Sequence, residues 1–367
     1  MKVCKTCVMD SETDPDLILV NDKCNHCIRY ENQFNSRVDT DEKAFKEIIK
    51  TIKLKGKNRK YDCIVGLSGG VDSSYVAILA KRYGLRPLAF HLDNGWNSEL
   101  AVKNIEVILK NYDIPLVTKV LNWEEFRKIQ LSFLKSGVPD GEIPTDHAIN
   151  ASIWDAAAKY KIPYILSGMN FQTESIMVPS WSYGHMDARY VKSVIKKNDG
   201  PKLRSFPTLS LVKLAFYTFL FGIKSISILN YIDYNKDKVI SELKEIGWSP
   251  YENKHYESSY TKFYQGYVLD HQFNIDKRKG HLSDLIFSGQ MTREKAFIEL
   301  ERKPLDDKEI RLMKMYVARK FKITLEELEV LLSRPRKNRN IYKSNKAALN
   351  FIKSAVNFFR ENNLYPK

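Results

Sequence analysis

The chain lacks any apolar run long enough to cross a membrane. Its most apolar segment, Leu209 to Ile232, is interrupted by Lys213 and Lys224. The uncharged part from Leu214 to Ile223 falls well short of the roughly 20 residues that a spanning helix needs. We therefore expect a pair of buried helices in this segment, with peripheral attachment to a membrane surface as the minority alternative.

The N-terminus also lacks the basic segment and apolar stretch of a signal peptide, since it is polar and contains cysteines. We expect a cytoplasmic protein. General disorder is excluded as well, because 43% hydrophobic and 28% charged residues are values close to the average of globular proteins. A length of 367 residues then predicts two or three domains.

Acidic residues are in short supply, with 44 Asp and Glu against 59 Lys and Arg, which gives a formal net charge of +15. A basic surface attracts nucleic acids, nucleotide phosphates, anionic sugars or an anionic membrane face. The charge therefore indicates a class of partner and no single partner.

Cysteines are few, and four of the five form two Cys-x-x-Cys pairs separated by sixteen residues. This spacing is typical of a closed tetrahedral zinc site, so we predict structural Zn²⁺ on Cys4, Cys7, Cys24 and Cys27. The metal would stabilise a short, polar, turn-rich segment that has little core of its own. An iron–sulfur cluster or redox thiols remain the alternatives.

Short apolar runs alternate with helical patterns through the first half of the chain. After an amphipathic helix at residues 41–54, the pattern predicts strands at 61–67, 86–92, 116–121 and 164–167 and helices at 75–83, 100–112 and 148–160. This alternation predicts an α/β fold with a parallel sheet covered on both faces. The ligand site is expected at the carboxyl ends of the strands.

Beyond about Arg204 the strand signals fade and the pattern becomes helical. Thr324 and Glu327 form a capping box before a helix at 325–332, and residues 334–346 hold six Lys or Arg without one acid. We therefore divide the chain into a zinc-binding module (1–35), an α/β domain (36–204) and a mainly helical region with a basic tail (205–367).

A glycine-rich loop joins the first strand to its helix in the segment Ile64-Val65-Gly66-Leu67-Ser68-Gly69-Gly70-Val71-Asp72-Ser73-Ser74. The glycines allow a sharp turn and close approach of an anion, while backbone N–H groups and the helix N-terminus attract phosphate. Serine hydroxyls can donate to phosphate oxygens, and Asp72 can hold Mg²⁺. The candidate phosphate-binding residues are Ser68, Gly69, Gly70, Val71, Asp72, Ser73 and Ser74.

The Ser-Gly-Gly-Val-Asp-Ser segment after a strand resembles the PP-loop ATP pyrophosphatases, which are adenine nucleotide alpha hydrolase-like enzymes. The resemblance implies that ATP is cleaved between the α and β phosphates and that AMP is left on a substrate oxygen. Asp93 lies in the segment His91-Leu92-Asp93-Asn94-Gly95, whose position matches the segment with which these enzymes hold adenosine. Gly168, Asn170 and Glu174 match it at the end of a later strand, with Glu174 as a second Mg²⁺ ligand or a solvated surface carboxylate.

Motifs in the C-terminal half make the resemblance more specific. They are Gly247-Trp248, Lys254-His255-Tyr256-Glu257-Ser258, Thr261, Phe263-Tyr264-Gln265-Gly266-Tyr267, Asp276-Lys277-Arg278-Lys279, His281-Leu282-Ser283 and Ser288-Gly289-Gln290-Met291-Thr292-Arg293. Together with the N-terminal cysteines they resemble the bacterial N-acetyl sugar amidotransferases of O-antigen and flagellin-sugar synthesis. The resemblance implies conversion of an acetamido group on a nucleotide-linked sugar to an acetamidino group.

Several residues in these motifs are candidates for the chemistry. We assign Lys277 and Arg278 as cations near the α-phosphate or substrate, although most basic runs are simply solvated. Lys254, His255 and Tyr256 are candidate substrate-binding residues. His147, which precedes a helix in Pro144-Thr145-Asp146-His147, is a candidate catalytic residue or a structural histidine.

The resemblance also implies partners, namely a glutaminase and a cyclase-like subunit that supply ammonia. Cys63, the one cysteine outside the pairs, lies within a strand, where it most simply serves as a small buried hydrophobe. No good nucleophile is then left for a glutaminase activity within this chain.

The competing interpretation is a PP-loop enzyme that adenylates and thiolates tRNA. The basic charge of this chain and its predicted zinc module would fit a tRNA enzyme. However, a thiolase that carries sulfur on its own persulfide needs an accessible cysteine. We therefore expect only weak, non-specific binding of nucleic acid.

Overall fold

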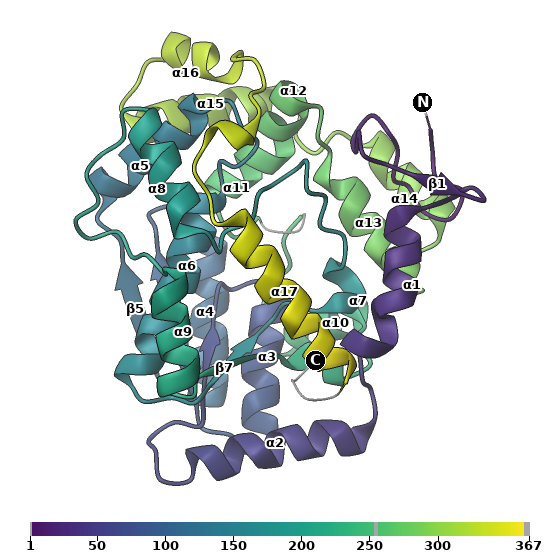
Figure 1. Ribbon diagram of the computed structural model, residues 1–367, viewed down its shortest axis with the longest axis vertical. Coiled ribbons are helices and arrows are strands. Elements are labelled where there is room, and N and C mark those ends of the chain that lie inside the picture. The colour runs from purple at the N-terminus through teal and green to yellow at the C-terminus, as the bar shows by residue number, and fades with distance from the viewer. Residues whose placement is uncertain (1, 253–255, 363–367) are drawn as a thin grey trace.

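The computed structural model describes residues 2–252 and 256–362, and its centre is a five-stranded parallel sheet (Figure 1). The strands run in the order β5-β4-β3-β6-β7. Their bounds are β3 (Cys63–Gly66), β4 (Pro87–Asp93), β5 (Leu116–Val120), β6 (Tyr164–Ser167) and β7 (Lys224–Ser227). All four pairings are parallel, which confirms the predicted α/β fold class.

Helices cover both faces of the sheet, because consecutive residues of the buried strands point to opposite sides. On one side, α3 (Val71–Arg82) packs on the sheet beside α4 (Glu99–Tyr112) and α10 (Lys236–Glu245). On the other side, α6 (Ile143–Lys159) packs on the sheet and against α5 (Trp123–Lys135) and α8 (Ala188–Lys197). The buried side chains accordingly form two large clusters, with Cys63 and Val65 in one and Ile64 in the other.

The remaining elements extend this frame at the two ends of the chain. The N-terminal ones are β1 (Leu19–Val20), β2 (Lys23–Cys24), α1 (Asn25–Arg37) and α2 (Glu42–Gly56). Short elements near the sheet are α7 (Phe171–Glu174), α9 (Leu211–Ala215), the π-helix η1 (Phe216–Leu220) and the 3₁₀-helix η2 (Ile228–Tyr231). The C-terminal ones are α11 (Ser259–Phe263), η3 (Tyr264–Val268), α12 (Leu269–Phe273), α13 (Lys277–Phe287), α14 (Arg293–Glu301), α15 (Asp307–Phe321), α16 (Leu325–Leu332), η4 (Arg339–Ile341) and α17 (Lys346–Glu361).

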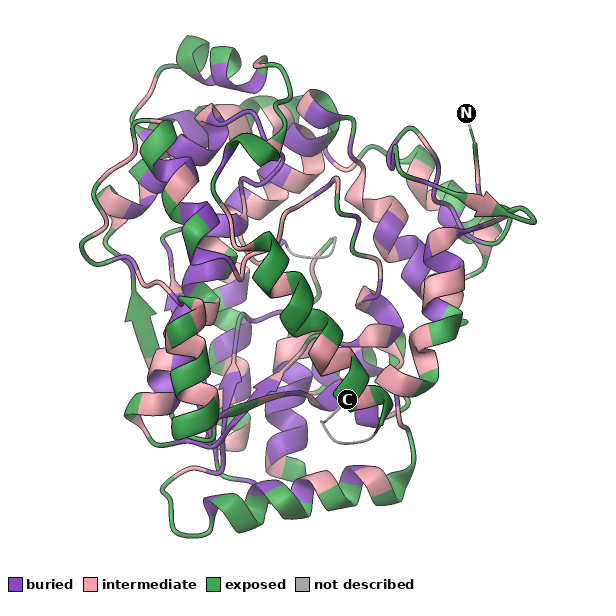
Figure 2. Ribbon diagram, viewed as in Figure 1, coloured by how far each residue is buried: buried purple, intermediate pink, exposed green. Residues whose placement is uncertain are grey.

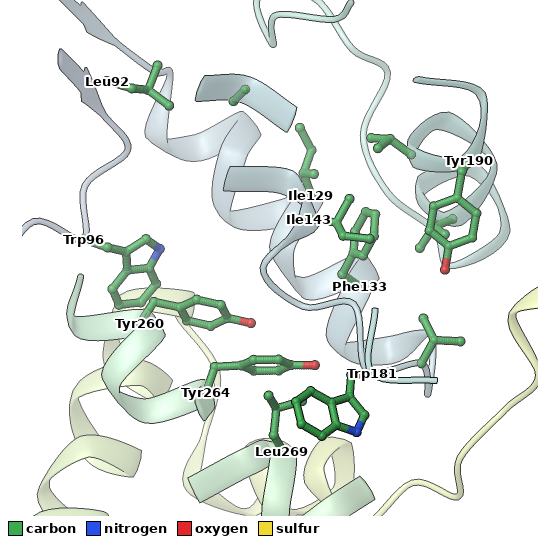
Figure 3. Packing of buried hydrophobic residues seen from close by; sticks show 14 of the residues in the cluster. Leu92, Trp96, Ile129, Phe133, Ile143, Trp181, Tyr190, Tyr260, Tyr264 and Leu269 are labelled. Atoms are coloured by element: carbon green, nitrogen blue, oxygen red, sulfur yellow. The ribbon is translucent and has the colours of Figure 1, made fainter. Parts of the chain in front are cut away.

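An aromatic cluster joins the C-terminal helices to the carboxyl end of the sheet (Figure 3). Trp96, in the loop after β4, lies 5.3 Å from Tyr260 between ring centroids, and Tyr260 stacks on Tyr264 at 5.6 Å. The Trp96 indole donates to Gln130 at 2.6 Å, so the buried N–H is satisfied. The C-terminal helices therefore share the core of the α/β domain.

Two details of the predicted organisation need correction. The boundary at residue 204 does not separate sheet from helices, because β7 pairs with β6 although it lies beyond that boundary. The segment Leu209–Ile232 is not a buried helix pair. It forms α9, η1, β7 and η2, and none of the residues of α9 or η1 is buried. A four-residue strand within an apolar run has too little periodicity to be distinguished from a helix.

Candidate functional site: the phosphate loop and the cysteine cluster

The loop after β3 has the geometry that anion binding requires. Gly69 has a φ of +86°, and Gly70 is the N-cap of α3 without a side chain to satisfy the first N–H groups of that helix. The Ser68 and Ser73 hydroxyls lie 3.1 Å apart at the mouth of the loop, and Ser68 is exposed. A strand, a left-handed glycine and an uncapped helix N-terminus together form a site for phosphate oxygens.

The backbone at Gly69 is held from behind by side chains far away in the sequence. Its carbonyl oxygen accepts from the Trp248 indole at 3.0 Å and from the Tyr251 hydroxyl at 3.1 Å. A Cβ at Gly69 would lie 2.5 Å from the carbonyl oxygen of Ala101, so α4 also presses against the turn. The loop is therefore fixed in its turn by contacts from two other parts of the fold.

Asp72 is hydrogen-bonded to a buried tyrosine, Tyr234, whose pKa also responds to Glu174. The Tyr234 hydroxyl donates to Asp72 Oδ1, and burial together with the Asp72 and Glu174 carboxylates raises the pKa of Tyr234. Both carboxylates therefore act electrostatically on Tyr234, and their role as Mg²⁺ ligands stays a prediction. Tyr234 itself is a site residue that the sequence motifs did not indicate.

Gly168 closes the site from the neighbouring strand β6. A Cβ at Gly168 would lie 3.1 Å from Ser73 N and 3.2 Å from Asp72 Cβ, so a larger residue here would push the two segments apart by a few tenths of an ångström. β3 and β6 are adjacent strands at which the order of the sheet reverses. The loop therefore lies at a topological switch point, where open α/β sheets bind ligands.

Asn170 and Asp93 have partly structural roles. Asn170 Oδ1 caps α7 by accepting from Thr173 N at 2.8 Å, whereas its buried Nδ2 has no partner among the described residues. Asp93 Oδ1 accepts from Gly95 N at 2.9 Å in the turn after β4. His91, on β4, donates from Nδ1 to the carbonyl oxygen of Leu67 at 2.9 Å, and this bond connects β4 to the start of the phosphate loop.

Glu257 is a second residue at the loop that the sequence analysis did not assign. A Cβ at Gly70 would collide with Glu257 Oε1, so this carboxylate lies directly against the loop. Glu257 is placed there because its carbonyl oxygen accepts from Ser98 N at 2.9 Å, beside the bridge between Asn97 and Ser258. A carboxylate oxygen against the N-cap of α3 occupies the kind of environment that a phosphate oxygen would.

Three of the predicted catalytic or substrate residues instead make structural contacts. His147 is buried, donating from Nδ1 to His185 O at 2.6 Å while its Nε2 accepts from Leu209 N at 3.3 Å. Burial lowers the pKa of His147, which favours the neutral imidazole. The two hydrogen bonds use both nitrogens of that neutral ring. Arg278 donates to Asp276 at 2.7 Å and to carbonyl oxygens at the end of α14. Tyr256 is buried and bonds Pro304 O at 3.4 Å.

Among the predicted site residues that remain, the structure describes Lys277 and Ser74. Lys277 Nζ forms an ion pair with Glu142 at 3.0 Å, and Gln265 donates to the same carboxylate at 2.9 Å. Ser74 is fully buried, so its hydroxyl faces the core and not the loop mouth. Lys254 and His255 lie outside the described residues.

The four N-terminal cysteines converge on one buried point. Their sulfur atoms all lie within 4.8 Å of one another, with Cys4–Cys27 at 3.6 Å, Cys7–Cys24 at 3.7 Å and Cys24–Cys27 at 3.5 Å. Four sulfurs at the usual Zn–S distance of about 2.3 Å are separated by about 3.8 Å in a tetrahedron. The separations are far longer than an S–S bond of about 2.0 Å, so the cluster fits a zinc ion and not disulfides.

The cysteine cluster is docked onto the C-terminal helices, beside which Figure 1 shows it. Arg293 donates to the carbonyl oxygens of Cys7 at 3.1 Å and Cys4 at 2.9 Å. Lys279 bonds Asp10, and it donates to Thr13 at 2.9 Å. The cysteine cluster therefore joins the N-terminal segment to α13 and α14.

Comparison with known proteins gives one family match. Residues 257–356 match the family model described as the C-terminal domain of WbpG-like LPS biosynthesis proteins. The match begins at Glu257, beside the phosphate loop, and continues through the basic segment 334–346. No curated protein sequence matches the chain.

Similar solved structures are distant. An NH₃-dependent NAD synthetase from Campylobacter jejuni is 16% identical, with 76% of this chain and 94% of that one covered at a TM-score of 0.29. An NMN synthetase from Francisella tularensis is 12% identical, with 76% and 97% covered at 0.30. A 4-thiouridine synthetase with RNA and ATP is 16% identical, with 71% and 53% covered at 0.29. Similarities this weak carry no functional argument, so the site rests on its own geometry.

Proposed function

We propose that this protein is an ATP-dependent, AMP-forming amidotransferase that converts the acetamido group of an N-acetylated, nucleotide-linked sugar into an acetamidino group. The observation that supports it most is a phosphate loop at the switch point of the sheet, next to a segment that matches an LPS biosynthesis domain. The family resemblance of the C-terminal motifs supplies the amide substrate. The activity would serve surface polysaccharide or flagellin-glycan synthesis.

The first half-reaction activates the amide. The amide oxygen attacks the α-phosphorus of ATP, the bond to the β-phosphate oxygen breaks, and pyrophosphate leaves with that electron pair. Ser68, Ser73 and the first N–H groups of α3 would hold the departing phosphates, which the 3.1 Å separation of the two hydroxyls and the uncapped helix start support. Asp72 and Glu174 would hold Mg²⁺, which supplies charge neutralisation on the phosphate oxygens when bound.

The second half-reaction replaces oxygen by nitrogen. Ammonia attacks the carbon of the O-adenylyl imidate, the carbon–oxygen bond breaks, and AMP leaves with the former amide oxygen. The sugar then carries an amidine, which is lighter than the amide by about one mass unit because NH replaces O. A loop that binds anions beside the reacting carbon would assist the departure of pyrophosphate in the first step and of AMP in the second.

The cysteines support an external source of ammonia. Four of the five thiols form the buried cluster, and Cys63 is fully buried within β3, where burial raises its pKa. A glutaminase needs an accessible thiolate, and burial suppresses the thiolate form. We therefore assign the ammonia supply to a partner glutaminase acting with a cyclase-like subunit. The same burial disfavours the alternative of a tRNA thiolase that carries sulfur on its own cysteine.

The reaction can be tested on the purified chain with ATP, Mg²⁺, ¹⁵N-ammonium and a panel of N-acetylated nucleotide sugars. We expect AMP, pyrophosphate and a ¹⁵N-labelled sugar product, a rate that rises with pH as ammonium loses its proton, and no turnover with glutamine alone. The variant Asp72→Asn is the control for adventitious ATP hydrolysis. Formation of ADP in place of AMP, or equal use of glutamine by the isolated chain, would contradict the proposal.

A further inference from the structure

A short apolar projection follows residue 210. Across α9 and η1, the exposed fractions reach 80% for Val212, 86% for Phe219 and 68% for Leu220. None of the residues in these two helical elements is buried. Large apolar side chains exposed together in this way mark an interaction site on a folded protein.

The C-terminal helix α17 has the same character. It is amphipathic over 16 residues, yet none of its residues is buried, and Phe351 and Phe358 are exposed by 76% and 60%. A helix gains most of its stability by packing an apolar face, and an unpacked helix of this length is marginal in water. The apolar face of α17 is therefore one that a further surface would cover.

The two apolar segments begin at the same place in the fold. Leu209 N donates to His147, which in turn donates to the carbonyl oxygen of His185. Two residues further along, Asp187 accepts from the Asn345 side chain at 3.2 Å. α9 and α17 thus both start near the loop of residues 185–187, and Figure 2 colours both helices as exposed or intermediate.

The net charge of the protein resides in the segments that hold these helices. Residues 188–232 contain eight Lys or Arg and one acid, and residues 330–360 contain eight Lys or Arg and none. The rest of the chain holds 43 basic and 43 acidic residues, which leaves it neutral. Many of these cations are exposed, among them Lys196, Lys202, Lys224, Lys343 and Lys353.

We propose that α9, η1 and α17 form a docking surface for an anionic lipid bilayer. Exposed Phe, Leu and Val side chains flanked by Lys and Arg are the combination by which helices lie in a membrane interface. No helix among the described residues is long and apolar enough to cross a membrane, so the contact is peripheral. A second copy of the chain would bring two basic faces together, which charge repulsion opposes.

The test is flotation of the purified full chain with vesicles of 30% phosphatidylglycerol and 70% phosphatidylcholine, and with vesicles of phosphatidylcholine alone. We expect binding to the anionic vesicles only, weaker at 500 mM salt than at 50 mM salt. The double variant Phe219→Asp/Leu220→Asp should bind about tenfold more weakly or worse, because two exposed apolar side chains that would enter the bilayer become charged. Phe351→Asp should weaken binding in the same direction.

A matched control introduces the same charge elsewhere. Ile298 on α14 and Leu312 on α15 are exposed by 57% and 56%, so Ile298→Asp/Leu312→Asp adds two acids to another surface. This variant should bind vesicles like the unmodified protein. Recovery of the unmodified protein free of anionic vesicles at 50 mM salt, or equal binding by both double variants, would overturn the proposal. A dimer that Phe219→Asp/Leu220→Asp dissociates, without vesicle binding, would assign the face to a second copy.

Discussion

The cysteine cluster and the phosphate loop are both short segments without a core of their own, but different parts of the chain specify them. In the cluster, four cysteine side chains meet at one point, and they come from nearby positions in one short segment. In the loop, most of the groups proposed to bind phosphate belong to the backbone, and side chains from distant elements hold that backbone in position. Changes at the cluster should therefore affect folding, whereas changes at the loop should affect chemistry.

The largest effect is expected at the cluster. Cys4→Ser removes one of four ligands, so we expect the protein to lose about one equivalent of zinc and more than about 4 kcal/mol of unfolding free energy. Metal analysis and thermal unfolding measure the two quantities. Cys63→Ser, which changes a buried thiol outside the cluster, should retain zinc. A full equivalent of zinc in Cys4→Ser, or iron in the unmodified protein, would contradict the assignment.

The opposite behaviour is expected at Asp72. Asp72→Asn should lower pyrophosphate release by about 100-fold with little change in melting temperature, because the change removes charge at the phosphates and not packing. Asp237→Asn, in the first turn of α10, makes the same change at another helix start and should leave turnover intact. Normal turnover in Asp72→Asn would show that the loop is not the ATP site.

Gly69 tests whether the loop acts through its backbone. Alanine at a positive φ costs about 1–2 kcal/mol of stability, and at Gly69 the new Cβ would also press on α4. Gly289 also has a positive φ, +69°, but a Cβ added there would have no atom within 4 Å. Gly289→Ala therefore controls for the backbone cost alone. We expect Gly69→Ala to lose more stability than Gly289→Ala because of the added contact with α4, and only Gly69→Ala to lose most of its pyrophosphate release. Equal activity in the two variants would argue against a backbone cradle.

Tyr234 gives the smallest and most specific effect. Tyr234→Phe removes the hydroxyl that orients Asp72, which should cost about 1 kcal/mol and raise the Mg²⁺ concentration needed for half-maximal rate. Tyr75, whose ring lies 6.4 Å from that of Tyr234, is the control as Tyr75→Phe. A change in turnover without any change in Mg²⁺ dependence would make Tyr234 a packing residue.

Local patterns in the sequence were sufficient for much of the frame. The strand at 164–167 and the helix at 325–332 were predicted with the bounds that the structure has, because alternation and a capping box are local signals. The spacing of the four cysteines likewise predicts that they converge, as the structure shows. Prediction was poorest at 209–232, where an apolar run gave no sign that α9 and η1 would stay exposed.

In the phosphate loop, the sequence alone determined the chemical groups, and the tertiary structure decided which distant residues contact them. Its glycines, serines and aspartate are contiguous, so their chemistry is readable before any folding is known. The contacts of Tyr234 with Asp72 and of Trp248 with Gly69 join residues more than 150 positions apart. The same holds for His147, which only its buried surroundings mark as structural. Such contacts depend on the packing of whole elements, and no local periodicity encodes them.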